Sequence, residues 1–346
     1  MRFYYLVFFL FVIQPGHSQQ WEQVINLRGT WKFEIGDNLK WADTHFDDNS
    51  WTNIHVPDSW ENEGFPGYDG YAWYRRNFII PTSESESELY LRLGYIDDVD
   101  EVYFNGTLIG FTGSFPPDYR TAYNEPRTYL LPTSLINFGK ENVLAIRVFD
   151  EQLEGGILRG DIGVYKQRNQ MELAMNLSGE WKFRTGDNFS WKDEDINDSH
   201  WNTILVPGFW ETQGYRDYDG FAWYRKEFIL PKDLENKKLI LVLGKIDDID
   251  ECYFNGTKIG ATGRMRDNPE EIRFSDEYQE FRAYYLPASD LRFGSKNTIA
   301  VRVYDGFIDG GIYQGPIGIT TREKYLDWKN TQSRDTFNIF EKLFGK

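Results

Sequence analysis

Leu93-Gly94-Tyr95-Ile96-Asp97-Asp98-Val99-Asp100-Glu101-Val102-Tyr103-Phe104-Asn105-Gly106-Thr107-Leu108-Ile109-Gly110 is a stretch that occurs twice in this chain. The second copy begins 150 positions later and reads Leu243-Gly244-Lys245-Ile246-Asp247-Asp248-Ile249-Asp250-Glu251-Cys252-Tyr253-Phe254-Asn255-Gly256-Thr257-Lys258-Ile259-Gly260. The acidic residues, the Asn-Gly pair and the final Ile-Gly recur in register. We interpret each copy as a strand that begins with four carboxylates and continues as an apolar run. A two-residue hairpin turn and a short return strand follow. The repeat therefore predicts two similar domains.

Further motifs repeat on both sides of this stretch. Leu27–Phe33 recurs as Leu177–Phe183, and Tyr68–Phe78 recurs as Tyr218–Phe228. The offset then grows from 150 to 155, so the second copy has five extra residues in the loop Arg264–Tyr284. Turn signals come at short intervals and neither copy contains a long helical pattern. These features predict an all-β fold of two tandem jelly-roll β-sandwiches.

The length of 346 residues accommodates two domains of ordinary size. We predict a signal peptide over residues 1–18, a first jelly roll over 19–168 and a second over 171–324. A tail over 325–346 follows, and the apolar spacing of Phe337–Phe344 predicts a short amphipathic helix there. Between the copies, the short polar linker Lys166–Gln170 leaves the domains little freedom.

The predicted signal peptide indicates a secreted or periplasmic protein. Its apolar run is too short to span a bilayer, so we expect no membrane span. The chain has one cysteine, which excludes an internal disulfide and favours a bacterial origin. Cys252 takes the place of Val102 in the other copy, so we expect it in the core rather than as a reactive thiol.

The composition excludes several classes of partner. The net charge is −16, whereas nucleic acids and anionic membranes need a basic face. Aromatic residues make up 17% of the chain, with 12 Trp and 22 Tyr. The four His residues form no metal-binding spacing.

The order of motifs resembles the sugar-binding jelly-roll domain of glycoside hydrolase family 2, which has the galactose-binding-like fold. These motifs are Gly-x-Trp-Lys-Phe, Trp-Tyr-Arg-[Arg/Lys]-x-Phe, Ile-Asp-Asp-x-Asp-Glu-x-Tyr-Phe-Asn-Gly and Gly-Gly-Ile. The Ile-Asp-Asp-x-Asp version with Asn-Gly is also similar to the jelly-roll portion of sialate O-acetylesterases. The resemblance covers nearly all of Leu27–Tyr165 and Leu177–Lys324.

The resemblance implies a non-catalytic role. In family 2 hydrolases this domain is an accessory, and the catalytic carboxylates lie in a downstream (β/α)8 barrel. In some family 2 galactosidases the domain lends the active site an Asp seven positions before the Ile of the glycine loop, which corresponds to Asp150 and Asp305 here. An Asn of those galactosidases falls at Arg76 and Lys226, so galactose specificity is not implied.

Aromatic and charged residues of the repeated motifs are the candidates for sugar contacts. Aromatic faces stack on the apolar side of pyranose rings, while Asp and Arg bind hydroxyl groups; the alternative is that the aromatic rings are ordinary core residues. The predicted ligand-binding residues, which include the acidic residues of the glycine loops, are Trp60, Tyr68, Asp69, Trp73, Arg75, Asp150, Glu154, Trp210, Tyr218, Asp219, Trp223, Arg225, Asp305 and Asp309.

The acidic strand has three alternative explanations. Its Asp residues could bind calcium, which takes six to eight oxygen ligands. They could also contact a ligand directly, or Asp98 and Asp100 could be paired structurally with Arg75 or Arg147. The candidate metal ligands are Asp97, Asp98, Asp100, Asp247, Asp248 and Asp250.

The sequence favours an exported, non-catalytic protein whose two jelly rolls bind an oligo- or polysaccharide as an accessory in glycan capture or degradation. Two linked sites raise avidity for a polymer if both can engage at once. A second hypothesis is a glycoside hydrolase with its site between the domains, which requires two carboxylates facing each other at about 5–10 Å. A third is a scaffold that packs against a partner glycoside hydrolase, which a large exposed apolar patch would indicate.

Overall fold

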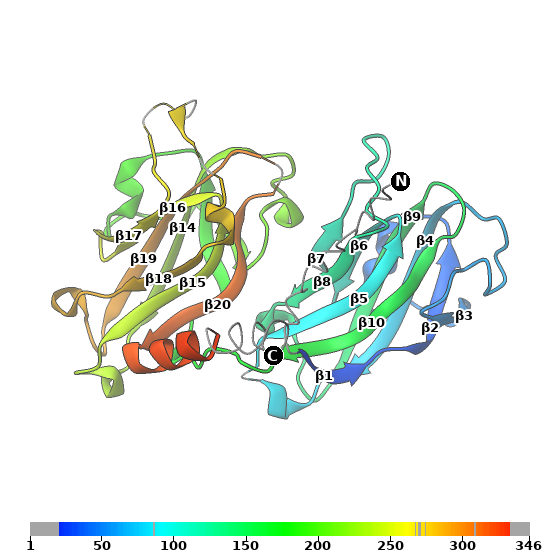
Figure 1. Cartoon of the computed structure of the whole chain (residues 1–346), viewed down its shortest axis with the longest axis horizontal. Helices are drawn as coiled ribbons and strands as arrows, with labels where there is room; N and C mark the ends of the chain where they lie inside the picture. The colour runs from blue at the N-terminus through cyan, green and yellow to red at the C-terminus, as the bar shows by residue number, and fades with distance from the viewer. Residues whose placement is uncertain are drawn as a thin grey trace, which may run out of the picture.

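A computed structural model describes residues 21–85, 87–266, 268, 271–273, 275–307 and 309–332 of the chain. The predicted signal peptide over residues 1–18 and the predicted helix at Phe337–Phe344 lie outside these residues. Two β-sandwiches lie side by side along the long axis of the molecule (Figure 1). Among the described residues, no helix is long and apolar enough to cross a membrane.

The first sandwich consists of two antiparallel sheets. Its strands are β1 (Trp21–Asn26), β2 (Gly29–Ile35), β3 (Thr52–Val56), β4 (Gly70–Ile79), β5 (Leu89–Asp97), β6 (Val99–Phe104), β7 (Thr107–Thr112), β8 (Pro126–Leu131), β9 (Glu141–Asp150) and β10 (Gly156–Gln167). One sheet has the strand order β3-β2-β4-β9-β6-β7 and the other has the order β1-β10-β5-β8. The two sheets enclose the core between them.

The second sandwich repeats this topology. Its strands are β11 (Met175–Asn176), β12 (Gly179–Thr185), β13 (Asn202–Val206), β14 (Gly220–Ile229), β15 (Leu239–Asp247), β16 (Ile249–Phe254), β17 (Thr257–Thr262), β18 (Phe281–Tyr285), β19 (Lys296–Asp305) and β20 (Gly311–Thr321). The sheet orders are β13-β12-β14-β19-β16-β17 and β11-β20-β15-β18, so each strand takes the place of the one numbered ten lower. The prediction of an all-β fold of two tandem sandwiches is confirmed.

The part of the repeated acidic stretch that precedes the Asn-Gly turn forms two strands, not the single strand that its sequence predicts. Strand β5 ends at Asp97 in the four-stranded sheet, and β6 begins at Val99 in the six-stranded sheet. Asp98 therefore lies where the chain crosses from one sheet to the other. The predicted hairpin is confirmed, because Phe104 pairs with Thr107 across an Asn-Gly turn whose two residues have φ of 49° and 81°.

Each sandwich has its own hydrophobic core. In the first, inward side chains of β5 and β10 meet those of β2, β4, β6 and β9, and they include Val102 and Phe104. In the second, Cys252 has no exposed surface and occupies the position of Val102. The prediction that Cys252 is a core residue is confirmed.

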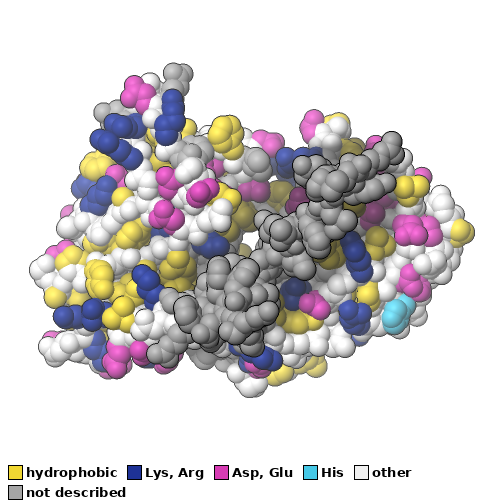
Figure 2. Space-filling view, in the orientation of Figure 1, with side chains coloured by type: hydrophobic (Ala, Val, Ile, Leu, Met, Phe, Trp, Pro, Cys, Tyr) yellow, Lys and Arg dark blue, Asp and Glu magenta, His cyan; other side chains and the backbone are white. Residues whose placement is uncertain are grey.

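Several contacts cross the junction between the sandwiches. The linker residue Gln170 accepts a hydrogen bond from the backbone N–H of Glu88, at 3.2 Å. A helix over residues 322–332 follows β20, and the indole of Trp328 in it donates to the carbonyl oxygen of Asn169, at 3.1 Å. An ion pair joins Arg216 to Glu101 at 3.2 Å. On the face that Figure 2 shows, acidic and basic side chains are interspersed over both sandwiches.

Candidate functional site

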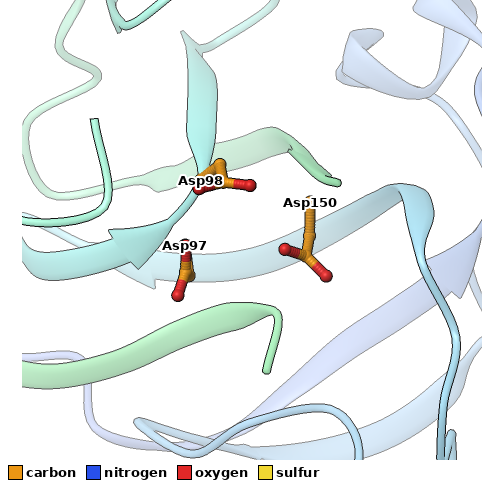
Figure 3. Close-up of side chains that lie close together, drawn as sticks. All are labelled: Asp97, Asp98 and Asp150. Atoms are coloured by element: carbon orange, nitrogen blue, oxygen red, sulfur yellow. The ribbon is translucent and has the colours of Figure 1, made fainter. Parts of the chain in front are cut away.

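Three carboxylates gather at one end of the first sandwich. Asp97 ends β5, Asp98 follows it at the crossing between the sheets, and Asp150 ends β9. Their proximity follows from strand pairing, because β9 pairs with β6 and the N–H of Asp98 donates to the carbonyl oxygen of Phe149 at 3.1 Å. One carboxylate oxygen from each residue lies within 4.8 Å of the other two, and the three side chains surround one small space (Figure 3). We call this group the first triad.

The oxygens of the first triad are only partly supplied with hydrogen-bond donors. Asp98 accepts from the hydroxyl of Thr121 at 2.5 Å and from the N–H of Glu151 at 3.0 Å. Asp150 has no exposed surface, and its Oδ1 accepts a long bond of 3.3 Å from the N–H of Gln152. Its Oδ2 has no hydrogen-bond partner. Burial raises the pKa of Asp150 to about 8.

The second sandwich repeats this arrangement as the second triad, formed by Asp247, Asp248 and Asp305. The N–H of Gly306 donates to Asp248 at 3.1 Å, and the N–H of Phe307 donates to Oδ1 of Asp305 at 3.3 Å. Oδ2 of Asp305 is again buried and without a partner. Burial raises the pKa of Asp305 to about 8.

Asp100 and Asp250, both candidate metal ligands in the sequence, belong to neither triad. Asp100 forms a fully buried ion pair with Arg127 at 2.7 Å and accepts from Tyr129, and Asp250 pairs in the same way with Arg282. The metal-ligand prediction is therefore wrong for these two residues.

Neither of the arginines that the sequence offered as partners of Asp98 and Asp100 pairs with those two residues. Arg75 binds Asp48 at 2.8 Å. Arg147 binds Asp37 and Glu101. Sequence spacing alone could not identify Arg127, because it reaches the acidic strand from β8 across a loop.

The predicted aromatic contacts lie mostly in the core. Trp60 and Trp210 have no exposed surface, and a Cβ atom added at Gly155 would lie 2.1 Å from the Trp60 ring. Trp73 and Trp223 are also fully buried, and each indole N–H donates to an Asp of its own sandwich, at 3.1 and 3.0 Å. No ring face of these four residues is open to a sugar, so a packing role replaces the predicted stacking role.

The remaining predicted residues divide into buried and accessible groups. Arg75 and Arg225 are buried and hold Asp residues of their own sandwiches. The hydroxyls of the half-buried Tyr68 and Tyr218 donate to backbone carbonyl oxygens at 2.7 Å. The accessible residues are Asp69, Glu154 and Asp219, which are exposed, and Asp309, which is half-buried.

Sequence reasoning missed a cluster of half-buried aromatic rings near the first triad. Phe149 directly precedes Asp150 on β9, and its ring lies 4.8 Å from that of Tyr71 and 5.6 Å from that of Tyr119. The rings of Tyr71 and Phe115 are stacked, with centroids 5.8 Å apart and an interplanar angle of 8°. We call Tyr71, Phe115, Tyr119 and Phe149 the aromatic cluster. The signal available in the sequence was the aromatic residue immediately before the Asp in both copies.

The second sandwich retains only part of this arrangement. Phe221 and Tyr304 take the places of Tyr71 and Phe149, with ring centroids 4.8 Å apart. Phe115 and Tyr119 lie in the loop that carries the five-residue insertion in the second copy. The two triads are therefore alike, whereas their surroundings differ.

Two cavities lie at the junction between the sandwiches. None of the six triad residues lines either cavity. One, of about 830 Å³, is bordered by the linker, Glu88 and Trp328. The other, of about 600 Å³, is bordered by Trp21, Phe209 and Tyr313 among others. Burial raises the pKa of Glu88 to about 7.

Comparison with known proteins relates the chain to glycoside hydrolases. No family model matches it. It is 28% identical over 141 residues to a β-glucuronidase of Formosa agariphila, covering 37% of this chain and 13% of that protein. It is 25% identical over 150 residues to the β-galactosidase BoGH2A of Bacteroides ovatus, covering 39% of this chain and 16% of that protein. A solved Bacteroides uniformis β-glucuronidase is 19% identical, covers 84% of this chain and 28% of that one, and has a TM-score of 0.37.

The predicted resemblance to family 2 glycoside hydrolases is confirmed by these relatives. The chain spans about one-seventh of the length of the curated relatives it matches, with between 13% and 16% of each relative covered. It is thus related to a fragment of those enzymes.

Proposed function

We propose that this chain binds carbohydrate without cleaving it, as an accessory in glycan degradation. The single observation that carries the proposal is that the same end of each sandwich presents a carboxylate triad with a buried, unpartnered oxygen. Sequence relatedness to a β-glucuronidase and a β-galactosidase supports a sugar as the ligand class. We propose export to the periplasm or the cell exterior as the setting.

The first sandwich offers the better-equipped site. Carboxylate oxygens accept hydrogen bonds from sugar hydroxyls, and Asp69 and Glu154 add exposed carboxylates near Asp97 and Asp150. The aromatic cluster adjoins this site through Tyr119, whose side chain is hydrogen-bonded to Asp98, and aromatic rings suit the apolar face of a pyranose. Buried polar groups that are satisfied only by the ligand discriminate strongly between ligands.

The test is binding of the full chain to a panel of immobilised neutral and acidic oligosaccharides. We expect a defined set of sugars to bind, and Phe115→Ala to weaken that binding at least tenfold. Tyr285→Ala is the control, because Tyr285 is 54% exposed but pairs with Ile240, at the end of β15 away from Asp247. Equal loss in both variants, or no binding by the unsubstituted chain, would refute the proposal.

The same panel separates binding from catalysis. Chromogenic glycosides of every bound sugar are incubated with the chain, and we expect no release of chromophore above that of the buffer. Release that depends on the chain would support the alternative of a hydrolase with its own site. Loss of that release in Glu88→Gln but not in Phe115→Ala would locate the hydrolytic site in the junction cavity.

A further inference from the structure

We propose that each triad binds one divalent, oxygen-preferring cation of the calcium class. The ligands are Asp97, Asp98 and Asp150 in the first sandwich and Asp247, Asp248 and Asp305 in the second. The inference concerns the same triad oxygens as the proposed sugar contacts, and it is tested without any sugar present.

The charge of the triads has no counterpart in the surrounding protein. None of the six carboxylates forms an ion pair among the described residues of the chain. Arg127 interacts electrostatically with Asp97 and donates to the carbonyl oxygen of Asp98, but its Nε is already bound to Asp100. Arg282 is bound to Asp250 in the same way. Three neighbouring carboxylates at low solvent exposure require a cation or protons.

A second observation points to the same space. Asp150 comes from a different strand than Asp97 and Asp98, has no exposed surface and has a partnerless Oδ2, and one of its two carboxylate oxygens faces Asp97 and Asp98 (Figure 3). Asp305 has the same burial and the same partnerless Oδ2 in the second sandwich. A buried carboxylate oxygen without a donor costs free energy. Its repetition in two sandwiches that differ in their surrounding loops indicates a shared requirement of the triads themselves.

The spacing suits calcium. Oxygens within 4.8 Å of one another lie no more than about 2.8 Å from a common centre, so a shift of a few tenths of an ångström brings all three to the usual calcium–oxygen distance of about 2.3–2.6 Å. Three carboxylates offer up to six oxygens, and calcium accepts six to eight in flexible geometry. The hydroxyl of Thr121 and the N–H of Glu151 orient Asp98, as donors to metal-binding carboxylates commonly do.

The experiment is calorimetric titration of the full, chelator-treated chain with calcium chloride alone, with magnesium chloride as a second arm. We expect about two calcium ions per chain. Asp150→Asn and Asp305→Asn should each reduce this to about one, and the double variant should bind none. Asp118→Asn is the matched control, because it removes an exposed carboxylate from the loop beside the first triad.

Thermal melting with chelator and with calcium distinguishes a variant that has lost its calcium site from one that has failed to fold. The proposal predicts that calcium raises the melting temperature of the unsubstituted chain and of Asp118→Asn, but not that of the double variant. With chelator, the double variant should melt no lower than the unsubstituted chain, because it has less repulsion in each triad. No calcium uptake by a folded, unsubstituted chain would overturn the proposal, and so would uptake unchanged in the double variant. Uptake of magnesium in preference to calcium would overturn the assignment to the calcium class.

Discussion

Replacing Arg127 with Met leaves the buried carboxylate of Asp100 without its cation. Both side chains have no exposed surface, and Nε of Arg127 lies 2.7 Å from the Asp100 oxygen. Arg127 also donates to the carbonyl oxygens of Ala122, Glu125 and Asp98. One side chain thus joins the β7–β8 loop to the point where the chain crosses between sheets.

Breaking a buried pair by removing one partner costs about 3–5 kcal/mol. For a sandwich of this size, each kcal/mol lowers the melting temperature by about 2–4 °C, so Arg127→Met should lower it by roughly 6–20 °C. The assay is urea and thermal unfolding followed by near-ultraviolet circular dichroism. Arg282 forms the equivalent pair with Asp250, so Arg282→Met should destabilise the second sandwich instead.

The double variant Asp100→Asn, Arg127→Met tests the pairing itself. If the ion pair is the main interaction, the loss of unfolding free energy in the double variant should be about 1–3 kcal/mol smaller than the sum of the losses in the two single variants. A cost below about 1 kcal/mol for Arg127→Met, or full additivity of the two single variants, would refute the reasoning.

Three further predictions concern a glycine of strand β5, the buried carboxyl group of Glu88 and an ion pair at the junction. Gly94→Ala should destabilise the first sandwich by more than about 3 kcal/mol in urea unfolding, because φ is +62° and the new Cβ would lie 1.9 Å from the Arg159 carbonyl oxygen; a change below about 1 kcal/mol would contradict this. Burial raises the pKa of Glu88 from 4.5 to about 7, so the folded chain holds a proton that the unfolded chain has released. This contribution to stability, at most about 3 kcal/mol, is complete below pH 4.5 and is lost as the pH rises through about 7. Urea midpoints of Glu88→Gln should therefore fall less steeply over that range than those of the unsubstituted chain, and parallel curves would exclude the effect. Arg216→Ala should change stability by less than about 1 kcal/mol, since Arg216 is 58% exposed in its pair with Glu101; a larger loss would show that the junction depends on this pair.

The repeat predicted the fold because both copies carry the same turn residues at the same spacing. Asn105-Gly106 was recognisable because a two-residue hairpin of this kind requires positive φ at both positions. The crossing at Asp98 was not recognisable, because polar and apolar residues continue through it with no break in the pattern. Whether such a run stays in one sheet depends on strands β8 to β10, which are distant in sequence.

The sequence predicted individual residues of the site but not their arrangement. Asp150 and the Asp97-Asp98 pair were each singled out, but as parts of different sites, since only the pairing of β6 with β9 brings them together. The aromatic residues were misjudged for a related reason. A Trp in a repeated motif such as Trp73 is equally compatible with core and surface, and only the packing of Trp41 and Trp51 against it decides that it is fully buried.

The linker between the sandwiches has a consequence for which glycans the chain can select. Gln170 is bound to Glu88 of the first sandwich, and Asn169 is bound to Trp328 beyond the second. Attachment on both sides restricts the range of distances between the two sandwich ends. If both ends bind, the chain selects glycans by the spacing of their repeating units as well as by their chemical groups. A polymer binds both ends only when the spacing of its repeats matches the distance between them. Short fragments, each of which reaches one end only, gain no affinity from the second site.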